Sequence, residues 1–271
     1  MAVLRISSAG NPLLKEYRRL LNGPRYRRAA GKMALEGPHL IREALRAGLM
    51  PETVFFTAAF ARGKNGALLA EMGSRVRRVE LPENLFHRLV ETDSPQGVAA
   101  VLPLPEVKAP SFSNYGAMIL LERLQDPGNM GTVLRTGAAA GIDAVYFTPD
   151  CADPYAPKVL RAAAGALFHL NLLPAQNPLA LIRDLKARDY RVLAAMPGGG
   201  QPHWEVDFRQ AFLLIIGNEG AGISQDLSAA ADTWVTIPQA GQVQSLNAAV
   251  AAAVILYEAL RQRKGGPPQD R

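Results

Sequence analysis

Two short apolar runs in the second half of the chain limit most strongly the folds that it can adopt. They are Ala117–Leu121 (AMILL) and Phe212–Ile216 (FLLII), and each leads into a polar or glycine-rich loop and then into a helical pattern. An unbroken apolar run of this length is typical of a strand that is buried on both faces. Such strands in alternation with helices predict a doubly wound α/β domain, whose binding sites lie beyond the carboxyl ends of parallel strands.

The rest of this half fits the same alternation. Further strands are expected at residues 144–147, 167–172, 190–195 and 233–237, and helices at residues 131–140, 155–163, 179–187 and 227–231. A last, long helix follows Asn247. Its residues Val250, Val254, Tyr257 and Leu260 recur at spacings of three and four, which predicts that they form its buried face. The alanines beside them predict close packing against another element.

The first half of the chain predicts a smaller α/β unit. Helices are expected at residues 13–21, 39–47, 67–72 and 82–90, and strands at residues 32–35, 53–57, 75–80 and 98–102. This order is typical of a parallel or mixed sheet covered by helices. Pro103, Pro105 and Pro110 then mark a linker. We therefore expect domains at residues 1–105 and 115–264, a linker at 106–114 and a disordered tail at 265–271.

Basic residues are concentrated near the N-terminus of a chain whose formal net charge is +6. Between Arg5 and Lys32, Glu16 is the only acidic residue. Such a cluster suits a polyanion, most simply a nucleic acid, and a solvated basic surface without a partner is the alternative. The residues that we expect to bind RNA are Arg18, Arg19, Arg25, Arg27, Arg28 and Lys32.

Composition argues against several classes of protein. Cys151 is the only cysteine, so the chain can form neither an internal disulfide nor a cysteine-cluster metal site. His39, His87, His169 and His203 show no metal-ligand spacing, and we expect no metal. No apolar run is long enough to span a bilayer and no secretory signal opens the chain, so we expect no membrane partner and a cytoplasmic location.

Three polar loops follow predicted strands in the second half, and parallel strands would gather them at one edge of the sheet. They are Gln125–Asn129, Gly217–Gly222 and Gln239–Asn247. Each alone is explained as an ordinary turn, whereas three together favour a binding site. The glycine loop lacks the lysine of a phosphate-binding loop, and Glu219 would repel a pyrophosphate, which argues against a nucleotide-dependent dehydrogenase. Arg135, on the helix after the first loop, suits a phosphate or alkoxide partner.

At these loops the sequence resembles a known family. The segments DPGNMGTVLRTGAAAG, IGNEGAGIS and IPQAGQVQSLNAAVAAAVILYE are similar to the three signature motifs of the SpoU/TrmH family of RNA 2′-O-ribose methyltransferases, in the SPOUT superfamily. The first half resembles the L30e-like substrate-binding domain of rRNA-modifying members, through ALEGPHLIREAL and TDSPQGVAAV. The sequence departs from the family at Gln239, where an apolar residue is usual, and in the loop MPGGG, which lacks the usual small hydroxyl residues.

The resemblance, taken position by position, implies the site. The catalytic positions are Asn129, Arg135, Glu219, Ser245 and Asn247. The positions that hold S-adenosylmethionine, largely through backbone groups, are Gly217, Ile237 and Leu246, with Met196, Asn218 and Gly220 from the adjoining loops. The resemblance also implies a trefoil-knotted parallel sheet, although knots are nearly absent among folds, and a homodimer with each site near the subunit interface.

The activity that the resemblance implies is methyl transfer from S-adenosylmethionine to a ribose 2′-hydroxyl of RNA. The donor is already activated, so the reaction needs no metal. Large-subunit (23S) rRNA is the first expectation, because a separate basic domain precedes the catalytic one. A tRNA 2′-O-methyltransferase is the alternative within the class. A non-catalytic RNA-binding factor for ribosome assembly is the alternative outside it, and a lack of cofactor binding would favour that interpretation.

Overall fold

The structure, a computed structural model, describes residues 3–110, 112–241 and 245–264 and divides the chain into two compact units. Unit 1 combines the chain up to Glu106 with Asp153–Phe168, and unit 2 combines Val107–Ala152 with the chain from His169 onwards. The chain therefore leaves unit 2 and later returns to it. Sequence order alone had placed the whole of residues 115–264 in one domain.

Unit 1 is built on a five-stranded mixed sheet in the order β1-β4-β3-β5-β2. Its strands are β1 (Leu4–Arg5), β2 (Lys32–Glu36), β3 (Thr53–Thr57), β4 (Arg77–Leu81) and β5 (Val98–Pro103). Strand β5 is antiparallel to β2 and β3, whereas β1, β3 and β4 are parallel. The helices are α1 (Pro12–Asn22), α2 (Pro24–Ala30), α3 (Pro38–Arg46), α4 (Ala58–Arg62), α5 (Leu68–Glu71), α6 (Glu83–His87) and α8 (Pro157–Ala163). The prediction of a parallel or mixed sheet is confirmed, while β1, α2 and α4 are additions to the predicted elements.

The core of unit 1 lies between the sheet and helices α1 and α6. Helix α1 begins where the Asn11 side chain accepts a hydrogen bond from the Leu13 N–H (2.9 Å), with Pro12 in its first turn. Its inner face includes Tyr17, whose ring meets that of Phe55 on β3 edge-to-face at 5.6 Å between centroids. This packing fixes the helix that carries much of the basic cluster.

The segment Asp153–Phe168 joins this unit through buried contacts. Val159 and Leu160 of α8 are almost fully buried, and α8 packs against β2. At the start of the segment, the Asp153 carboxylate accepts a hydrogen bond from Arg27 Nε at 2.8 Å and lies 2.7 Å from Arg27 Nη2. Chain order could not predict this packing, because the segment is attached in sequence to strands of unit 2.

Unit 2 is a seven-stranded sheet in which every neighbouring pair is parallel, in the order β10-β12-β9-β11-β6-β7-β8. The strands are β6 (Ala117–Leu121), β7 (Ala144–Phe147), β8 (Asn171–Pro174), β9 (Arg191–Ala195), β10 (Gln201–Pro202), β11 (Phe212–Ile216) and β12 (Thr233–Thr236). The two apolar runs form β6 and β11, which are paired at the centre and buried along their whole length. The predicted doubly wound sheet is confirmed.

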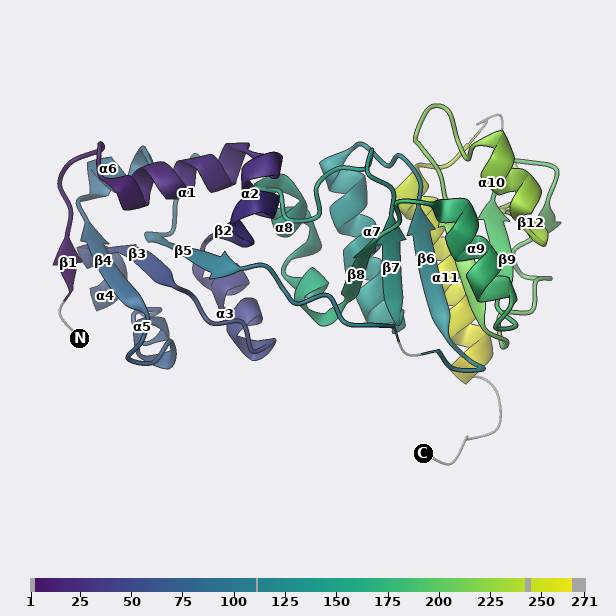
Figure 1. The fold of residues 1–271 in the computed structure, drawn as a ribbon, viewed down its shortest axis with the longest axis horizontal. Helices are drawn as coiled ribbons and strands as arrows, with labels where there is room; N and C mark the ends of the chain where they lie inside the picture. Colours follow the sequence, from purple (N-terminus) through teal and green to yellow (C-terminus); the bar gives the residue numbers. More distant parts are fainter. Residues whose placement is uncertain (1–2, 111, 242–244, 265–271) are drawn as a thin grey trace. The chain divides into compact units, whose positions relative to one another are not determined.

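Helices cover both faces of this sheet, as the right half of Figure 1 shows for α9 and α11. The helices are α7 (Pro127–Ala140), α9 (Pro178–Lys186), α10 (Gln225–Ala230) and α11 (Ala248–Lys264). Met118 and Leu120 pack with residues of α9 and α10 in one cluster. The intervening Ile119 points to the opposite face, close to Gly137 of α7. Helix α11 packs against α7 on that side.

The predicted buried face of α11 is wrong. Val250 and Tyr257 are 48% and 51% exposed, and the buried residues of α11 are Ala249, Ala252, Ile255, Leu256 and Ala259. The neighbour is α7, and three of the five buried residues of α11 are alanines, so the helix can approach closely. Val250 and Tyr257 are left on the outer side, and the expected close packing of alanines is confirmed.

Two other element boundaries differ from prediction. Helix α7 begins at Pro127, so Asn129 lies in its first turn and not in a loop. The segment predicted as a strand at residues 167–172 is a 3-10 turn at Ala166–His169 followed by β8. Gln244 of the third loop and the predicted tail at 265–271 lie outside the described residues. The threading of the expected knot stays a prediction, because residues 242–244 belong to the segment concerned.

Candidate active site

A cavity of about 350 Å³ opens at the carboxyl ends of the central strands of unit 2. Its walls include Ala195 at the end of β9, Ile216 at the end of β11 and Val235 of β12. The other lining residues come from the loops after these strands and from the start of α11: Met196, Pro197, Gly217, Asn218, Glu219, Gly220, Gly222, Ile237, Gln239, Ser245, Leu246, Asn247, Ala248, Ala251 and Ile255. The cavity thus lies at the edge where a parallel sheet is expected to bind ligands.

A chain of hydrogen bonds joins the three polar loops beside this cavity. Asn247 Nδ2 donates to Asn129 Oδ1 at 2.8 Å, and Asn129 Nδ2 donates to Glu219 Oε1 at 3.0 Å. Asn247 also begins helix α11, because its Oδ1 accepts from the N–H groups of Ala249 (2.9 Å) and Val250 (3.2 Å). Each amide therefore has a defined orientation, and the three loops are held in one arrangement.

Glu219 is the acceptor at which this chain ends. Its carboxylate also accepts from the backbone N–H groups of Asp126 (3.1 Å) and Gln125 (3.4 Å). Partial burial raises the pKa of Glu219, but hydrogen bonds from the Asn129 side chain and from backbone N–H groups outweigh it, and the net pKa is lowered. The carboxylate is therefore ionised at neutral pH and fastens the start of α7 to the second loop.

The second loop is shaped by contacts that only glycine permits. A Cβ on Gly217 would lie 2.4 Å from the backbone of Gly222, and Gly222 itself has a φ of +68°. Backbone hydrogen bonds of 3.0 Å run in both directions between Asn218 and Gly222. The Asn218 side chain accepts from the N–H groups of Gly220 and Ala221 at 2.9 Å and donates to the Arg123 carbonyl at 2.8 Å. The loop is therefore rigid before any ligand binds.

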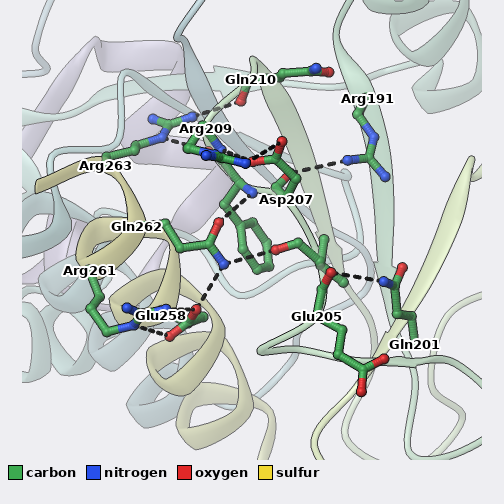
Figure 2. A network of polar contacts seen from close by, with 12 residues as sticks. Arg191, Gln201, Glu205, Asp207, Arg209, Gln210, Glu258, Arg261, Gln262 and Arg263 are labelled. Atoms are coloured by element: carbon green, nitrogen blue, oxygen red, sulfur yellow. Dashed lines mark hydrogen bonds and ion pairs between the residues drawn. The ribbon is translucent and has the colours of Figure 1, made fainter. Parts of the chain in front are cut away.

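The far end of α11 is fastened by a second polar network, which Figure 2 shows from close by. Gln262 donates from Nε2 to the Val206 carbonyl (2.9 Å) and accepts at Oε1 from the Phe208 N–H (2.9 Å). Arg263 donates to the carbonyls of Phe208 (2.8 Å) and Gln210 (3.0 Å). Burial lowers the pKa of Arg263. These contacts fix the axis of the helix whose first turn borders the cavity.

The structure brings most of the predicted site residues together. All six predicted cofactor residues line the cavity, as do Glu219, Ser245 and Asn247, and Asn129 joins them through its hydrogen bonds. Arg135 is the exception. It lies six residues after Asn129, about 9 Å along the helix and about 120° around it, on an exposed part of α7. It has no hydrogen bond or ion pair with any residue that the structure describes.

The predicted RNA contacts separate into two groups. Arg19, Arg25 and Arg28 are exposed on α1 and α2, and Arg18 is half-buried. The guanidinium of Arg19 stacks on the Tyr26 ring at 3.9 Å. These side chains remain available to a partner at the surface.

Two of the predicted contacts do not fit that role. Arg27 is only 3% exposed, because it pairs with Asp153 and also donates to the carbonyls of Leu20 and Leu21, so its assignment as a surface contact is wrong. Lys32 is half-buried between Glu16 (3.2 Å) and Glu52 (2.7 Å), which compensate its charge. Neither residue offers a free cation to RNA.

Sequence reasoning missed three residues at the site. Asp126 accepts from the Asn129 N–H at 2.7 Å and begins α7, a role that the Asp-Pro pair could have indicated. Arg123 follows β6 with a φ of +52°, and its Nε lies 3.6 Å from Glu122 Oε1 but has no hydrogen-bond partner among the described residues. Gln239 lines the cavity, and its Oε1 is buried without a hydrogen-bond partner in the described ranges. Besides the Asp-Pro pair, the position of Gln239, as a departure from the family pattern, gave a sign in the sequence, whereas nothing in the sequence indicated Arg123.

The cavity fits the predicted cofactor in size and in chemistry. Its volume lies within the range of small-molecule pockets, and its walls combine apolar side chains with a few polar groups. Ser245, Asn247 and the backbone of Gly217 and Gly220 supply polar groups at these walls. Within residues 3–110, 112–241 and 245–264, no group of His, Cys, Asp or Glu could hold a metal ion, and no helix could cross a membrane.

Known proteins share this fold and these loops. Residues 116–257 match the SpoU rRNA Methylase family, and residues 11–100 match the MRM3-like substrate binding domain. The chain is 37% identical to an uncharacterized tRNA/rRNA methyltransferase of Synechocystis sp., over 96% of this chain and 95% of that protein. It is 34% identical to the 23S rRNA (guanosine(2553)-2′-O)-methyltransferase RlmP of Bacillus subtilis, over 93% of this chain and 98% of the relative. The crystal structure of the SpoU methyltransferase AviRb from Streptomyces viridochromogenes with AdoMet is similar with a TM-score of 0.86 and 30% identity, over 95% of this chain and 100% of that chain.

Proposed function

The chain belongs to the SpoU rRNA methylase family, and from that membership we propose that it methylates a ribose 2′-hydroxyl of large-subunit (23S) rRNA with S-adenosylmethionine. The observation that supports this most directly is the hydrogen-bonded chain from Asn247 through Asn129 to Glu219, which joins all three family motifs beside one cavity. The rRNA substrate is supported by the activity of relatives such as RlmP of Bacillus subtilis and by the match of residues 11–100 to a substrate-binding domain.

S-adenosylmethionine, when bound, supplies a methyl group on a sulfonium centre. The residues that would hold it are those lining the cavity, with the backbone of Gly217, Ile237 and Leu246 foremost. Because Glu219 and Asn129 lock the second loop to the start of α7, the walls of this site need little reorganisation on binding.

Arg135 is the candidate for stabilising the reacting hydroxyl. An arginine is essentially always protonated, so the side chain is poorly suited to act as a base. We assign it to the phosphate beside the target ribose and to the negative charge that develops on the 2′-oxygen. Its exposed position and its lack of a described partner leave the guanidinium free to meet RNA.

The proposal is tested with purified protein, S-adenosylmethionine carrying a labelled methyl group, and either rRNA or tRNA as acceptor. Label should enter rRNA and should protect the adjacent phosphodiester from alkaline hydrolysis, because the 2′-hydroxyl is blocked. Arg135→Ala should reduce turnover by at least a hundredfold while cofactor affinity changes only a few-fold. Label in tRNA alone would identify the protein as a tRNA 2′-O-methyltransferase and would contradict the rRNA substrate. A protein that binds no cofactor would contradict the enzyme assignment.

We also propose that the protein is a homodimer that uses the outer side of α11. Val250 and Tyr257 are about half exposed there, and Leu246 lies exposed two residues before the helix. Exposed apolar side chains that recur on one side of a helix are typical of a protein interface. Tyr257→Lys should shift the protein to monomer in sedimentation, whereas Tyr115→Lys, at another exposed tyrosine of unit 2, should not.

We also propose that the protein is located in the cytoplasm. An rRNA substrate requires the enzyme to be present where ribosomes are assembled.

A further inference from the structure

Arg123 is held in an unusual backbone conformation at the carboxyl end of β6. Its φ of +52° lies in the left-handed region, which favours glycine. Hydrogen bonds on both sides hold the residue there: its N–H donates to Thr148 Oγ1 at 3.0 Å, and its carbonyl accepts from Asn218 Nδ2 at 2.8 Å. Residues that are kept in such conformations are concentrated at functional sites. An arginine at a position that suits glycine favours a role for its side chain.

The fold itself does not use the guanidinium of Arg123 as a hydrogen-bond donor. The side chain is 38% exposed, and none of its nitrogens donates a hydrogen bond to a residue that the structure describes. The Glu122 carboxylate lies 3.6 Å from Nε, but it already accepts from the Ser224 N–H at 2.8 Å. Because Nε is buried, the exposed surface belongs to the other atoms of the side chain, which include both Nη groups. They are available to an anion outside the chain.

The strand order places Arg123 away from the cofactor cavity. The walls of the cavity come from β9, β11, β12 and α11, and Arg123 is not among the residues that line it. Arg123 follows β6, which lies on the other side of β11 in the order β12-β9-β11-β6. The hydrogen bond between Asn129 and Glu219 joins the loops that follow β6 and β11. A ligand that meets Arg123 therefore approaches these two residues from outside the cavity, which is the side left for RNA.

The local charges call for a cation if RNA binds here. Asp126 and Glu219 place carboxylates at the same loops, where they would repel a phosphate backbone. Among residues 115–135, Arg123 and Arg135 are the only arginines or lysines. Arg135 lies on α7 and Arg123 on the loop before that helix, so the two guanidinium groups stand on different elements. A strand of RNA along this edge would meet them at different phosphates.

We propose that Arg123 binds a backbone phosphate of the RNA next to the nucleotide that is methylated, and so positions the strand for the reaction. The inference rests on the proposed function, since it takes RNA to be the substrate. A guanidinium suits this contact because it can donate two parallel hydrogen bonds to one phosphate. Arg123 is then a substrate-binding residue of unit 2, in addition to Arg135 and to the basic cluster of unit 1.

The test measures methyl transfer and RNA binding with the full-length protein and an rRNA fragment that the wild type methylates. Arg123→Gly removes the cation and suits the positive φ, so the variant should fold. Its KM for RNA should rise about tenfold, while kcat changes less than about threefold. The slope of log K against log salt should fall by about one. Calorimetry should show no change in affinity for S-adenosylhomocysteine. Arg123→Lys keeps the charge and should keep the salt slope.

Two controls separate the charge from the backbone. Asp189→Gly makes the same backbone change at an exposed residue of unit 2 whose φ is +62°, and Arg209→Ala removes an exposed cation of unit 2. Neither variant should alter the KM for RNA or the salt slope. If Arg123→Gly is unstable, Arg123→Gln keeps most of the side-chain bulk and should show the same losses.

Three outcomes would overturn the assignment of Arg123. An unchanged salt slope in Arg123→Gly would show that Arg123 does not contact RNA. A loss of stability with an unchanged slope would make the residue a counter-ion of Glu122. A loss of cofactor affinity would instead assign it to the cofactor carboxylate. All three leave the proposed function intact, whereas a wild-type protein that methylates no RNA would contradict the proposed function and this inference together.

Discussion

The two units differ in how their polar and charged side chains are held. On α2 of unit 1, Arg25 and Arg28 are exposed, so they can meet a polyanion in many arrangements. In unit 2, Asn129 and Glu219 are tied into a hydrogen-bonded chain that allows one arrangement beside the cavity. Affinity for a polyanion needs only the number and density of charges, whereas chemistry at one atom needs fixed geometry. Substitutions of exposed arginines in unit 1 should therefore lower RNA affinity in small steps. Single substitutions at the unit 2 site should instead cause a large loss of turnover.

The largest effect should come from Arg27, a buried cation of unit 1 that is held in one arrangement. Asp153→Ala would leave the guanidinium of Arg27 buried without its carboxylate, at a cost of about 3 kcal/mol in the free energy of unfolding of unit 1. Denaturant titration monitored by hydrogen exchange in β2 and α1 would measure it. Asp150→Ala, at an exposed acidic residue nearby, should change the free energy by less than about 0.5 kcal/mol. Equal values for the two variants would show that the buried pair contributes nothing.

The next largest effect should come from Glu219. Glu219→Ala removes the acceptor shared by Asn129, Asp126 and Gln125, so kcat should fall about a hundredfold as the loops lose their arrangement. Single-turnover methyl transfer would measure the loss, with Glu205→Ala as the control at a carboxylate away from the cavity. Turnover within a few-fold of wild type would make Glu219 an ordinary turn residue.

Substitution of the exposed arginines of unit 1 should have a smaller effect, and the effect should be on RNA affinity. The double variant Arg25→Ala/Arg28→Ala should lower affinity for rRNA fragments about tenfold at moderate salt and reduce the slope of log K against log salt by roughly one to two. Cofactor affinity should not change. Filter binding over a salt series would measure both quantities, with Arg209→Ala in unit 2 as the control cation. An unchanged salt slope would remove α2 from the RNA-binding surface.

The smallest effect should be that of pH on the Glu219 contacts. The pKa of Glu219 is lowered below its ordinary value of 4.5, so its contribution is complete above that value and is lost as pH falls through the folded pKa. Cofactor affinity should therefore stay constant between about pH 6 and pH 8 and weaken only below about pH 4. Calorimetry across this range tests the sign. A Glu219-dependent loss near pH 6 would mean that burial dominates over the donated hydrogen bonds.

The sequence predicts an element well where the pattern of that element's own residues is enough to define it. The strands β6 and β11 follow from unbroken apolar runs, which fit only a strand buried on both sides. The gathering of the three loops follows from the parallel order of the strands. The inner face of α11 could not be predicted, because it depends on how the helix packs against α7 and not on the size of its own side chains.

The sequence could not predict pairs that form across long separations. Arg27 looked like one more surface cation, and only its contact with Asp153, 126 residues away, makes it a buried structural residue. Arg135 shows the reverse case. Its motif predicts a place with Glu219 and Asn129, yet one chain places it on an exposed turn of α7, because six helical residues rotate it away from them. We therefore expect RNA or a second subunit to bring the reacting group to Arg135.

The return of Asp153–Phe168 to unit 1 means that the backbone passes between the units three times, at 106/107, 152/153 and 168/169. A single recombination point in the proline-rich linker would therefore transplant only part of unit 1. The graft would lack the apolar side chains of Val159 and Leu160, and the donor would keep them without their binding surface. During evolution, we expect two parts of the gene to be inherited together: the first half and the short segment after β7 that encodes Asp153–Phe168. Coordinated substitution between these stretches is the record that such a history would leave.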